Sequence, residues 1–333
     1  MSEILPSVTV LIAARPGQPE LKAVAASRVL DYPPDKLEII VARGKQPSAQ
    51  RNAGMKAAHG ELIYFLDDDS VPRRDNLERV VAHFQRPAVK MVGGPNICPE
   101  EAPALEQIFA LVLGSWAMAS SRSRYTPVGK VRETSEKELI LCNLIARREP
   151  MLELGGFNEA LYPNEENALM DELQKTGGKL IYDPEFLVAR RPRSTLKSFC
   201  RMLMTYGRGR AEQFRLHPTF GSALNFVPPL FVLYLLSTVA LLVAAPTVAR
   251  FLFVPLACYC VAVLGQAMVL AATGRILLSM AAIPLIGLTH ILYGLGFWRG
   301  LFTNLHAASA AQPIAVELEI VKPSAAGAST KNG

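Results

Sequence analysis

Acidic residues and lysine are absent from one long stretch of the chain, residues 225–298, where Arg250 and Arg275 carry the only full charges. A soluble segment of this length would carry many more charged side chains, so the gap excludes an ordinary solvent-exposed domain. Breaks at Pro246 and Gly274 divide the stretch into three apolar spans, each with about the 20 residues that a bilayer crossing needs. The sequence therefore predicts a membrane region of about three transmembrane helices over residues 220–303, rather than a buried helical hairpin.

Cysteine and glycine-rich phosphate loops are also scarce. The five cysteines show neither metal-ligand spacing nor a disulfide framework, which agrees with a reducing compartment. No Gly-x-Gly-x-x-Gly follows the first expected strand, and no loop ends in Gly-Lys-Ser/Thr. These absences exclude the common dinucleotide and phosphate-loop sites, so a nucleotide would have to be held by a metal and by side chains.

Cations gather just before the first span, between Arg190 and Arg215. By the positive-inside rule, residues 1–219 lie in the cytoplasm and the chain is a multi-pass protein of the cell (inner) membrane. The net charge of +6 is assigned to this membrane flank, because nothing resembles a nucleic-acid-binding module. A second interpretation is that some of these arginines hold a pyrophosphate. Three crossings would place the tail, expected to be flexible over residues 304–333, outside; a re-entrant span would return it to the cytoplasm.

Residues 1–100 alternate short apolar runs with helical segments. Strands are expected at residues 8–14, 37–41, 62–66 and 90–93, and helices at residues 20–30, 48–59 (with Gly60 as C-cap) and 76–84. Alternation of this kind predicts an α/β fold with a mostly parallel sheet flanked by helices.

Three aspartates, Asp67, Asp68 and Asp69, directly follow the apolar run 62–66. Ligands of open α/β sheets bind beyond the carboxyl ends of the strands, and adjacent carboxylates raise one another's pKa unless a cation joins them. Mg²⁺ typically takes one or two carboxylates together with substrate phosphates. The alternative is a solvated acidic turn, since Asp69 and Ser70 are good N-cap residues for a following helix.

Further segments accompany the triplet in a fixed order. They are Gln50-Arg51-Asn52-Ala53-Gly54, Ala57-Ala58-His59-Gly60-Glu61, Phe65-Leu66-Asp67-Asp68-Asp69, Leu154-Gly155-Gly156-Phe157-Asn158, Glu165-Glu166 and Lys179-Leu180-Ile181-Tyr182-Asp183-Pro184. Together they resemble the family-2 glycosyltransferases over about residues 8–210. The chain is most similar to the membrane-anchored transferases of exopolysaccharide assembly, which also carry a segment like Tyr206–Arg210.

The resemblance implies a GT-A fold and inverting transfer of a sugar from a nucleotide-sugar donor to a lipid-linked, polyprenyl-type acceptor. The product would belong to surface polysaccharide or glycolipid synthesis, and the cofactor would be Mg²⁺ or Mn²⁺. By the same resemblance Asp67 and Asp69 hold the metal, while the donor meets Asp68 and three further residues, Arg51, Asn52 and Asn143. The metal would stabilise the departing diphosphate as a Lewis acid.

The general base implied by the resemblance is Glu166, at a position where the family usually has aspartate. Its longer side chain leaves Glu165 as the alternative base, and an acidic helix start is the non-catalytic interpretation of both. The family usually has aspartates after the second strand, and these are also missing. Arg43 and Lys45 stand there instead, either to contact phosphate or to be solvated. Two other functions therefore stay open: a different metal-dependent phosphate enzyme, such as a nucleotidyltransferase or pyrophosphatase, and a non-catalytic membrane scaffold.

Overall fold

The computed structural model describes residues 5–19, 21–159, 161, 164–216, 218, 220–272, 274–303 and 315–323. The chain forms two compact units. The sheet unit comprises Met1–Pro99, Ser120–Arg191 and Ala307–Gly333, and the helical unit comprises Glu100–Ala119 and Pro192–His306. The sequence assigned residues 192–219 to the soluble domain, whereas by their contacts they group with the apolar helices.

The sheet unit is built on an eight-stranded sheet with the order β11-β2-β1-β3-β8-β5-β9-β7. Five of these strands, β1, β2, β3, β5 and β9, run in one direction, and β7, β8 and β11 run against them. The α/β class and the GT-A-type, mostly parallel sheet expected from the sequence are therefore confirmed. The strands are β1 Val8–Ala14, β2 Leu37–Arg43, β3 Leu62–Asp67, β5 Val89–Gly93, β7 Arg132–Thr134, β8 Asn143–Arg147, β9 Lys179–Tyr182 and β11 Glu317–Val321; a second sheet pairs β4 Val71–Pro72, β10 Val188–Ala189 and β6 Asn96–Ile97.

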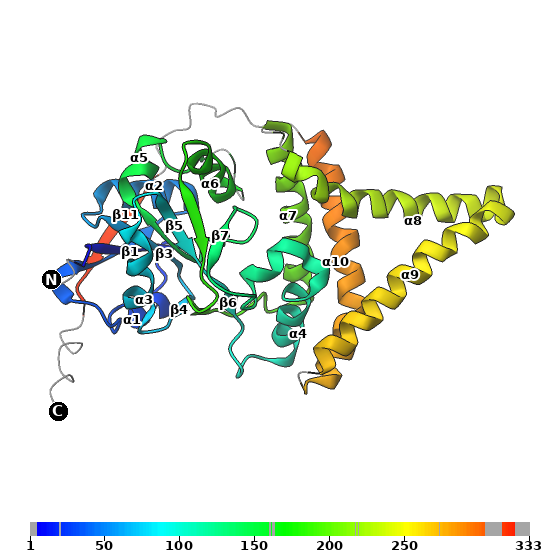
Figure 1. The fold of residues 1–333 in the computed structure, drawn as a ribbon, viewed down its shortest axis with the longest axis horizontal. Coiled ribbons are helices and arrows are strands. Elements are labelled where there is room, and N and C mark those ends of the chain that lie inside the picture. The colour runs from blue at the N-terminus through cyan, green and yellow to red at the C-terminus, as the bar shows by residue number, and fades with distance from the viewer. Residues whose placement is uncertain are drawn as a thin grey trace. The chain divides into compact units, whose positions relative to one another are not determined.

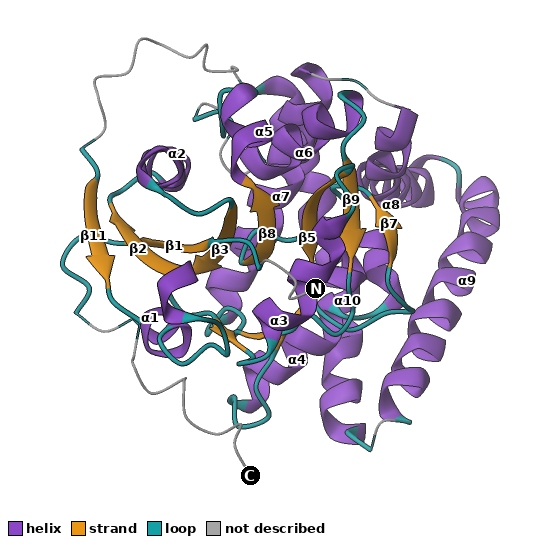
Figure 2. Cartoon of the chain, turned by 60° about the vertical axis from the view of Figure 1, so that its left-hand side comes forward, coloured by secondary structure: helices purple, strands orange, loops and turns teal. Residues whose placement is uncertain are grey.

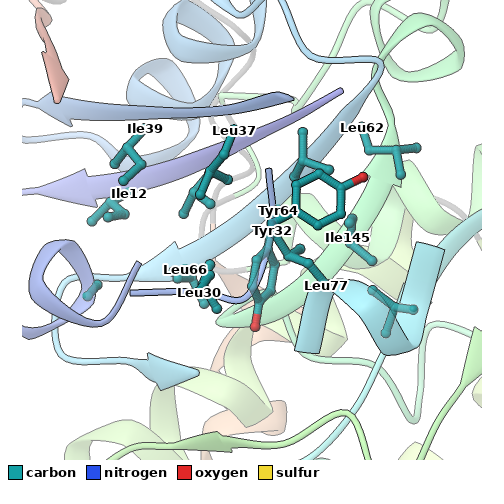
Figure 3. Close-up of a cluster of buried hydrophobic side chains, with 14 of the residues drawn as sticks. Ile12, Leu30, Tyr32, Leu37, Ile39, Leu62, Tyr64, Leu66, Leu77 and Ile145 are labelled. Carbon is teal, nitrogen blue, oxygen red and sulfur yellow. The ribbon is translucent and has the colours of Figure 1, made fainter. Parts of the chain in front are cut away.

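Helices cover both faces of the large sheet (Figure 2). Their bounds are α1 Lys22–Ser27, α2 Pro47–Ala57, α3 Asn76–Val81, α5 Arg148–Glu153 and α6 Glu165–Lys175, with short 3-10 turns at Pro34–Lys36, Ala82–Gln85 and Trp116–Arg124. One core lies between the sheet and α1 and α3 and includes Ile12, Leu66 and Leu77 (Figure 3). A second core lies on the opposite face against α2, α5 and α6 and includes Met55 and Met151. Because both faces are covered, the central strands β1 and β3 are almost entirely apolar and buried.

The sequence predicted Gly60 as the C-cap of α2, and this prediction is wrong. The helix ends at Ala57 and its C-cap is Ala58. A Cβ atom on Gly60 would lie 2.5 Å from the backbone nitrogen of Thr9, and Gly60 donates its N–H to the Thr9 hydroxyl at 2.9 Å. Glycine is required here for the close approach of two backbones and not for a helix terminus.

The tail after the apolar helices returns to the sheet unit. Residues 317–321, within the segment predicted to be flexible, form β11, which pairs antiparallel with β2 from Glu317↔Arg43 to Val321↔Ile39. The expectation that three crossings would put Ala307–Gly333 on the far side of the membrane is therefore wrong for the described residues 315–323. The backbone groups of the exposed edge of β2 attract a further strand, a tendency that the sequence pattern does not reveal.

The helical unit consists of α4 Ala104–Leu113, α7 Leu196–Leu216, α8 Val227–Ala244, α9 Pro246–Ala271 and α10 Ile276–Phe302, with a 3-10 turn at Phe220–Phe226. Three segments are long and apolar enough to cross a membrane: Ala223–Ala244, Pro246–Ala271 and Ile276–Phe302. Helices α8 and α9 leave opposite ends of α10 and meet at a distance from it (Figure 1). Helix α10 instead packs along α7, with Gly207 against the carbonyl of Tyr293 and Gly296 against that of Met204.

Candidate active site

Two aspartates of the predicted metal motif meet at the carboxyl end of β3. Asp67 is the last residue of β3, and Asp69 follows in the turn. One guanidinium joins them: Arg190 Nη2 lies 3.0 Å from Asp67 Oδ2, and Arg190 Nε donates to Asp69 Oδ1 at 2.6 Å. The pairing of β10 with β4 and β6 holds Arg190 in place, and its backbone N–H donates to Ile97 O at 2.9 Å.

Arg51 links this carboxylate pair to α6. It lies on α2, almost fully buried, and its Nη2 lies 3.3 Å from Asp67 Oδ1. Its Nη1 donates to Glu165 Oε1 at 3.0 Å, and Glu165 is itself only 2% exposed. The structure therefore brings Arg51, Asp67, Asp69 and Glu165, together with Arg190, into one connected group.

The two glutamates at the start of α6 lie in different environments. Burial raises the pKa of Glu165 to about 7, repulsion by Glu166 adds to this, and Arg51 partly opposes it. Glu165 Oε2 is buried and has no hydrogen-bond partner among the described residues. Glu166 is only half-buried. A carboxylate that titrates near neutral pH is suited to proton transfer, and the N-terminus of α6 favours negative charge on both side chains.

The two asparagines named from the sequence are placed differently from each other. Asn52 Nδ2 donates to Phe157 O and to Glu159 Oε1, each at 2.9 Å, and its Oδ1 accepts from Phe157 N, so it holds the loop after Gly156. Asn143 is completely buried, accepting from Tyr64 Oη and donating to Phe186 O. Its side-chain bonds fasten β8 within the sheet unit.

The oxygen ligands that this site offers fit a divalent cation held by two carboxylates. No group of three His, Cys, Asp or Glu side chains among the described residues is arranged as a complete metal cage. Asp67 and Asp69 nevertheless face one point, since a single guanidinium reaches both. Two carboxylates completed by substrate phosphates are the usual set for Mg²⁺. Asp68 makes no ion pair in the part of the chain that the structure describes.

Two observations go beyond the sequence prediction. Arg190 belonged to the cations before the first span, for which membrane flanking and pyrophosphate binding were both open. Its ion pairs with Asp67 and Asp69 were not predicted. Arg43, considered for phosphate contact, donates from Nη2 to Glu319 Oε2 of β11 at 3.0 Å and from Nη1 to Gln18 O. Its guanidinium is therefore used within the fold.

Comparison with known proteins agrees with this geometry. Residues 20–109 match the family model described as glycosyl transferase family 2. It is 29% identical over 174 residues to the pre-mycofactocin glycosyltransferase of Mycobacterium tuberculosis, which covers 52% of this chain and 36% of that protein. It is 35% identical over 86 residues to glycosyltransferase AglE of Haloferax volcanii, covering 26% of this chain and 28% of the relative. The chain thus spans about a third of the length of these relatives.

A solved structure resembles nearly the whole fold. The mannosyltransferase PcManGT of Pyrobaculum calidifontis, determined in complex with GDP-Man and Mn²⁺, aligns with a TM-score of 0.52 and 18% identity. The alignment covers 89% of this chain and 87% of that one. At this identity the likeness confirms the GT-A-type fold.

Proposed function

We propose that this protein transfers a sugar from a nucleotide-sugar donor to a lipid-linked acceptor at a membrane surface, with inversion at the anomeric carbon. The observation that carries the proposal is the group formed by Asp67, Asp69, Arg190, Arg51 and Glu165 beyond the end of β3. This is the end of a parallel sheet at which ligands bind. The family 2 match over residues 20–109 supports the same reaction class.

On the donor side, Asp67 and Asp69 would hold Mg²⁺ or Mn²⁺. Such a cation neutralises the diphosphate as it departs. Arg190 and Arg51 add fixed positive charge beside the two carboxylates, and a guanidinium fork matches phosphate oxygens well. Asp68 and the loop held by Asn52 complete the donor side in this proposal. The bound GDP-Man and Mn²⁺ of PcManGT support a nucleotide-sugar donor and a divalent metal.

On the acceptor side, Glu166 is the proposed general base, because it is accessible while its neighbour is buried and paired. Glu165 would keep Arg51 in position and favour proton uptake nearby through its own negative charge. Glu166→Gln should remove transfer while leaving donor binding intact. If that variant turns over normally and Glu165→Gln does not, the base is Glu165.

The membrane arrangement follows from the return of the tail. Both the chain before α7 and strand β11 belong to the sheet unit, so an even number of helices must cross the bilayer between them. Helix α10 packs along the cationic helix α7 and is the helix least suited to crossing. We therefore assign the crossings to α8 and α9, with the sheet unit on the cytoplasmic side, where the cations before α8 favour it.

Cysteine labelling in sealed inner-membrane vesicles tests this assignment. Single cysteines replace Ala245, Gly274 and Lys322 in a chain without its native cysteines, and a membrane-impermeant maleimide is added from each side. Two crossings by α8 and α9 predict residue 245 outside and residues 274 and 322 on the cytoplasmic side. Residue 322 outside would mean three crossings, and residue 245 inside would exclude α8 as a crossing helix.

Product analysis tests the reaction itself. Nucleotide-sugars are supplied with Mg²⁺ or Mn²⁺ and a polyprenyl-phosphate acceptor, and nucleoside diphosphate and glycosylated lipid are measured. Release of pyrophosphate or inorganic phosphate instead would indicate a nucleotidyltransferase or a pyrophosphatase. Donor binding without transfer to any acceptor would indicate a non-catalytic scaffold.

A further inference from the structure

A cationic pocket lies in the helical unit. It has a volume of about 310 Å³ and is lined from α7 and α10. Four of its lining residues are cations: Lys197, Arg201 and Arg208 on α7, and Arg299 on α10. No acidic side chain lines it among the described residues. Four like charges that share one pocket repel one another, so an anionic ligand would stabilise the arrangement.

The cations of this pocket are poorly neutralised by the protein. Lys197, Arg201 and Arg299 form no ion pair with any residue that the structure describes. Arg208 has Glu212 nearby, with Nε 3.4 Å from Oε1, yet its Nε is buried and makes no hydrogen bond. The positive charge of the pocket is therefore left largely uncompensated by the protein.

The pocket is held rigidly by the contact between α7 and α10. A Cβ atom on Gly296 would lie 2.2 Å from the carbonyl of Met204, and one on Gly300 would lie 2.3 Å from the carbonyl of Arg208. Only glycine allows these two helices to approach so closely. The close approach fixes the backbone of α10 next to Arg299 relative to the backbone of Arg208, so both side chains start from fixed positions on neighbouring helices.

The surroundings of the pocket point to a lipid. At the end of α10 that carries Arg299, Trp298 Nε1 donates to Pro229 O at the beginning of α8, an apolar helix long enough to cross a membrane. Arg299 therefore lies level with the end of an apolar helix, the depth at which lipid phosphates are found. Met204 and Cys200 supply apolar lining beside the cations. We propose that this pocket binds the phosphate group of a membrane lipid.

The proposal rests on the membrane association proposed above and not on the transfer reaction. It is tested by the native Cys200, which lines the pocket, in full-length protein whose other four cysteines are replaced. The protein is placed in nanodiscs of phosphatidylcholine alone, or of phosphatidylcholine with phosphatidylglycerol or polyprenyl phosphate. The rate at which a maleimide labels Cys200 is measured in each, and also with inorganic phosphate added to phosphatidylcholine discs.

Lipids with an accessible anionic phosphate should slow the labelling of Cys200. Arg201→Gln/Arg208→Gln should raise the lipid fraction needed for half-protection about 30-fold, because each cation at an anionic surface contributes about 1 kcal/mol. Arg210→Gln, on the same helix outside the pocket lining, is the matched control and should change little. If the double variant does not fold, Arg299→Gln alone should raise the half-protection point about fivefold.

The outcomes separate the possibilities. Stronger protection by polyprenyl phosphate than by phosphatidylglycerol identifies an acceptor-type monoester, and equal protection identifies a general headgroup site. Protection by inorganic phosphate alone, or protection unchanged in the pocket variants, overturns the proposal. Nucleoside diphosphate release measured in the same discs keeps this result separate from the transfer reaction: turnover without protection refutes only the pocket, and protection without turnover refutes only the proposed function.

Discussion

Replacement of Arg51 by methionine should destabilise the protein more at pH 8 than at pH 6. Arg51 is the cation that opposes the burial of Glu165, whose pKa is raised to about 7. A carboxyl whose pKa is higher in the folded state contributes its full stability below its unfolded pKa, near 4.5, and loses it as the pH rises toward the folded value. In the wild type this loss levels off above pH 7; without Arg51 it should continue to higher pH.

The size of the effect follows from the same pKa. At pH 8, one unit above it, the ionised form of Glu165 in the wild type is favoured by about 1.4 kcal/mol over the protonated form. The Arg51→Met variant loses this stabilisation at pH 8, because its folded state keeps Glu165 protonated. At pH 6 Glu165 is already mostly protonated, so nothing comparable is lost. Loss of hydrogen bonds to charged partners adds about 2 kcal/mol at both pH values. We expect a destabilisation of about 3 kcal/mol at pH 8 and about 2 kcal/mol at pH 6.

Equilibrium denaturation in detergent at the two pH values measures the difference. Arg148→Met is the matched control: this half-buried arginine donates to the Met55 carbonyl at 2.9 Å and pairs with no carboxylate among the residues that the structure describes, so its cost should not depend on pH. An Arg51→Met cost that is equal at the two pH values, or larger at pH 6, would refute the proposed electrostatic coupling to Glu165.

Three further predictions concern other parts of the chain. Burial opposes ionisation of Asp183, but hydrogen bonds from a histidine and an arginine lower its pKa from 3.8 to about 2. The ionised carboxylate therefore contributes about 2 kcal/mol to the free energy of unfolding above pH 4, and this contribution is lost as the pH falls toward 2. Asp183→Asn should destabilise the protein at pH 7 and hardly at pH 2, measured by denaturant titration. Gly207→Ala should cost about 1–3 kcal/mol in thermal unfolding, because its Cβ would lie 2.1 Å from a carbonyl of α10, whereas Gly265→Ala, with open space around it, should not destabilise. Arg190→Gln should lower kcat/KM for donor about 10- to 100-fold in a nucleoside diphosphate release assay, as expected for the loss of a hydrogen bond to a charged partner, and an unchanged value would remove Arg190 from the site.

The sequence predicted those parts of the fold that depend on local pattern. The strands that begin at Val8, Leu37 and Leu62 are mostly apolar, and their parallel pairing follows from the helices between them. Helix ends were less accurate: the helix expected over residues 76–84 ends at Val81 and gives way to a 3-10 turn at Ala82–Gln85. The three apolar spans were also evident from the missing charges alone.

What the sequence missed depends on contacts between distant segments. The ion pair of Arg43 with Glu319 joins residues 276 positions apart, and the pairing of β11 with β2 joins segments that are similarly distant. No periodicity in the sequence reports such contacts. Arg190 was indistinguishable from its basic neighbours until β10 placed it beside Asp69. The roles of Asp67, Asp69, Glu165 and Glu166 in catalysis remain predictions, although the structure brings the first three of these residues together through Arg51 and Arg190.

The most direct test of the central claim is a nucleotide-sugar screen with purified protein in lipid nanodiscs that contain polyprenyl phosphate. Nucleoside diphosphate and glycosylated lipid are measured together, with Mg²⁺ or Mn²⁺ and with chelator, for the wild type and for Asp69→Ala. The account predicts that both products form in equal amounts with one donor, that chelation stops their formation, and that Asp69→Ala forms neither while keeping the thermal stability of the wild type. Transfer by Asp69→Ala at the wild-type rate, or formation of pyrophosphate in place of glycosylated lipid, would contradict it.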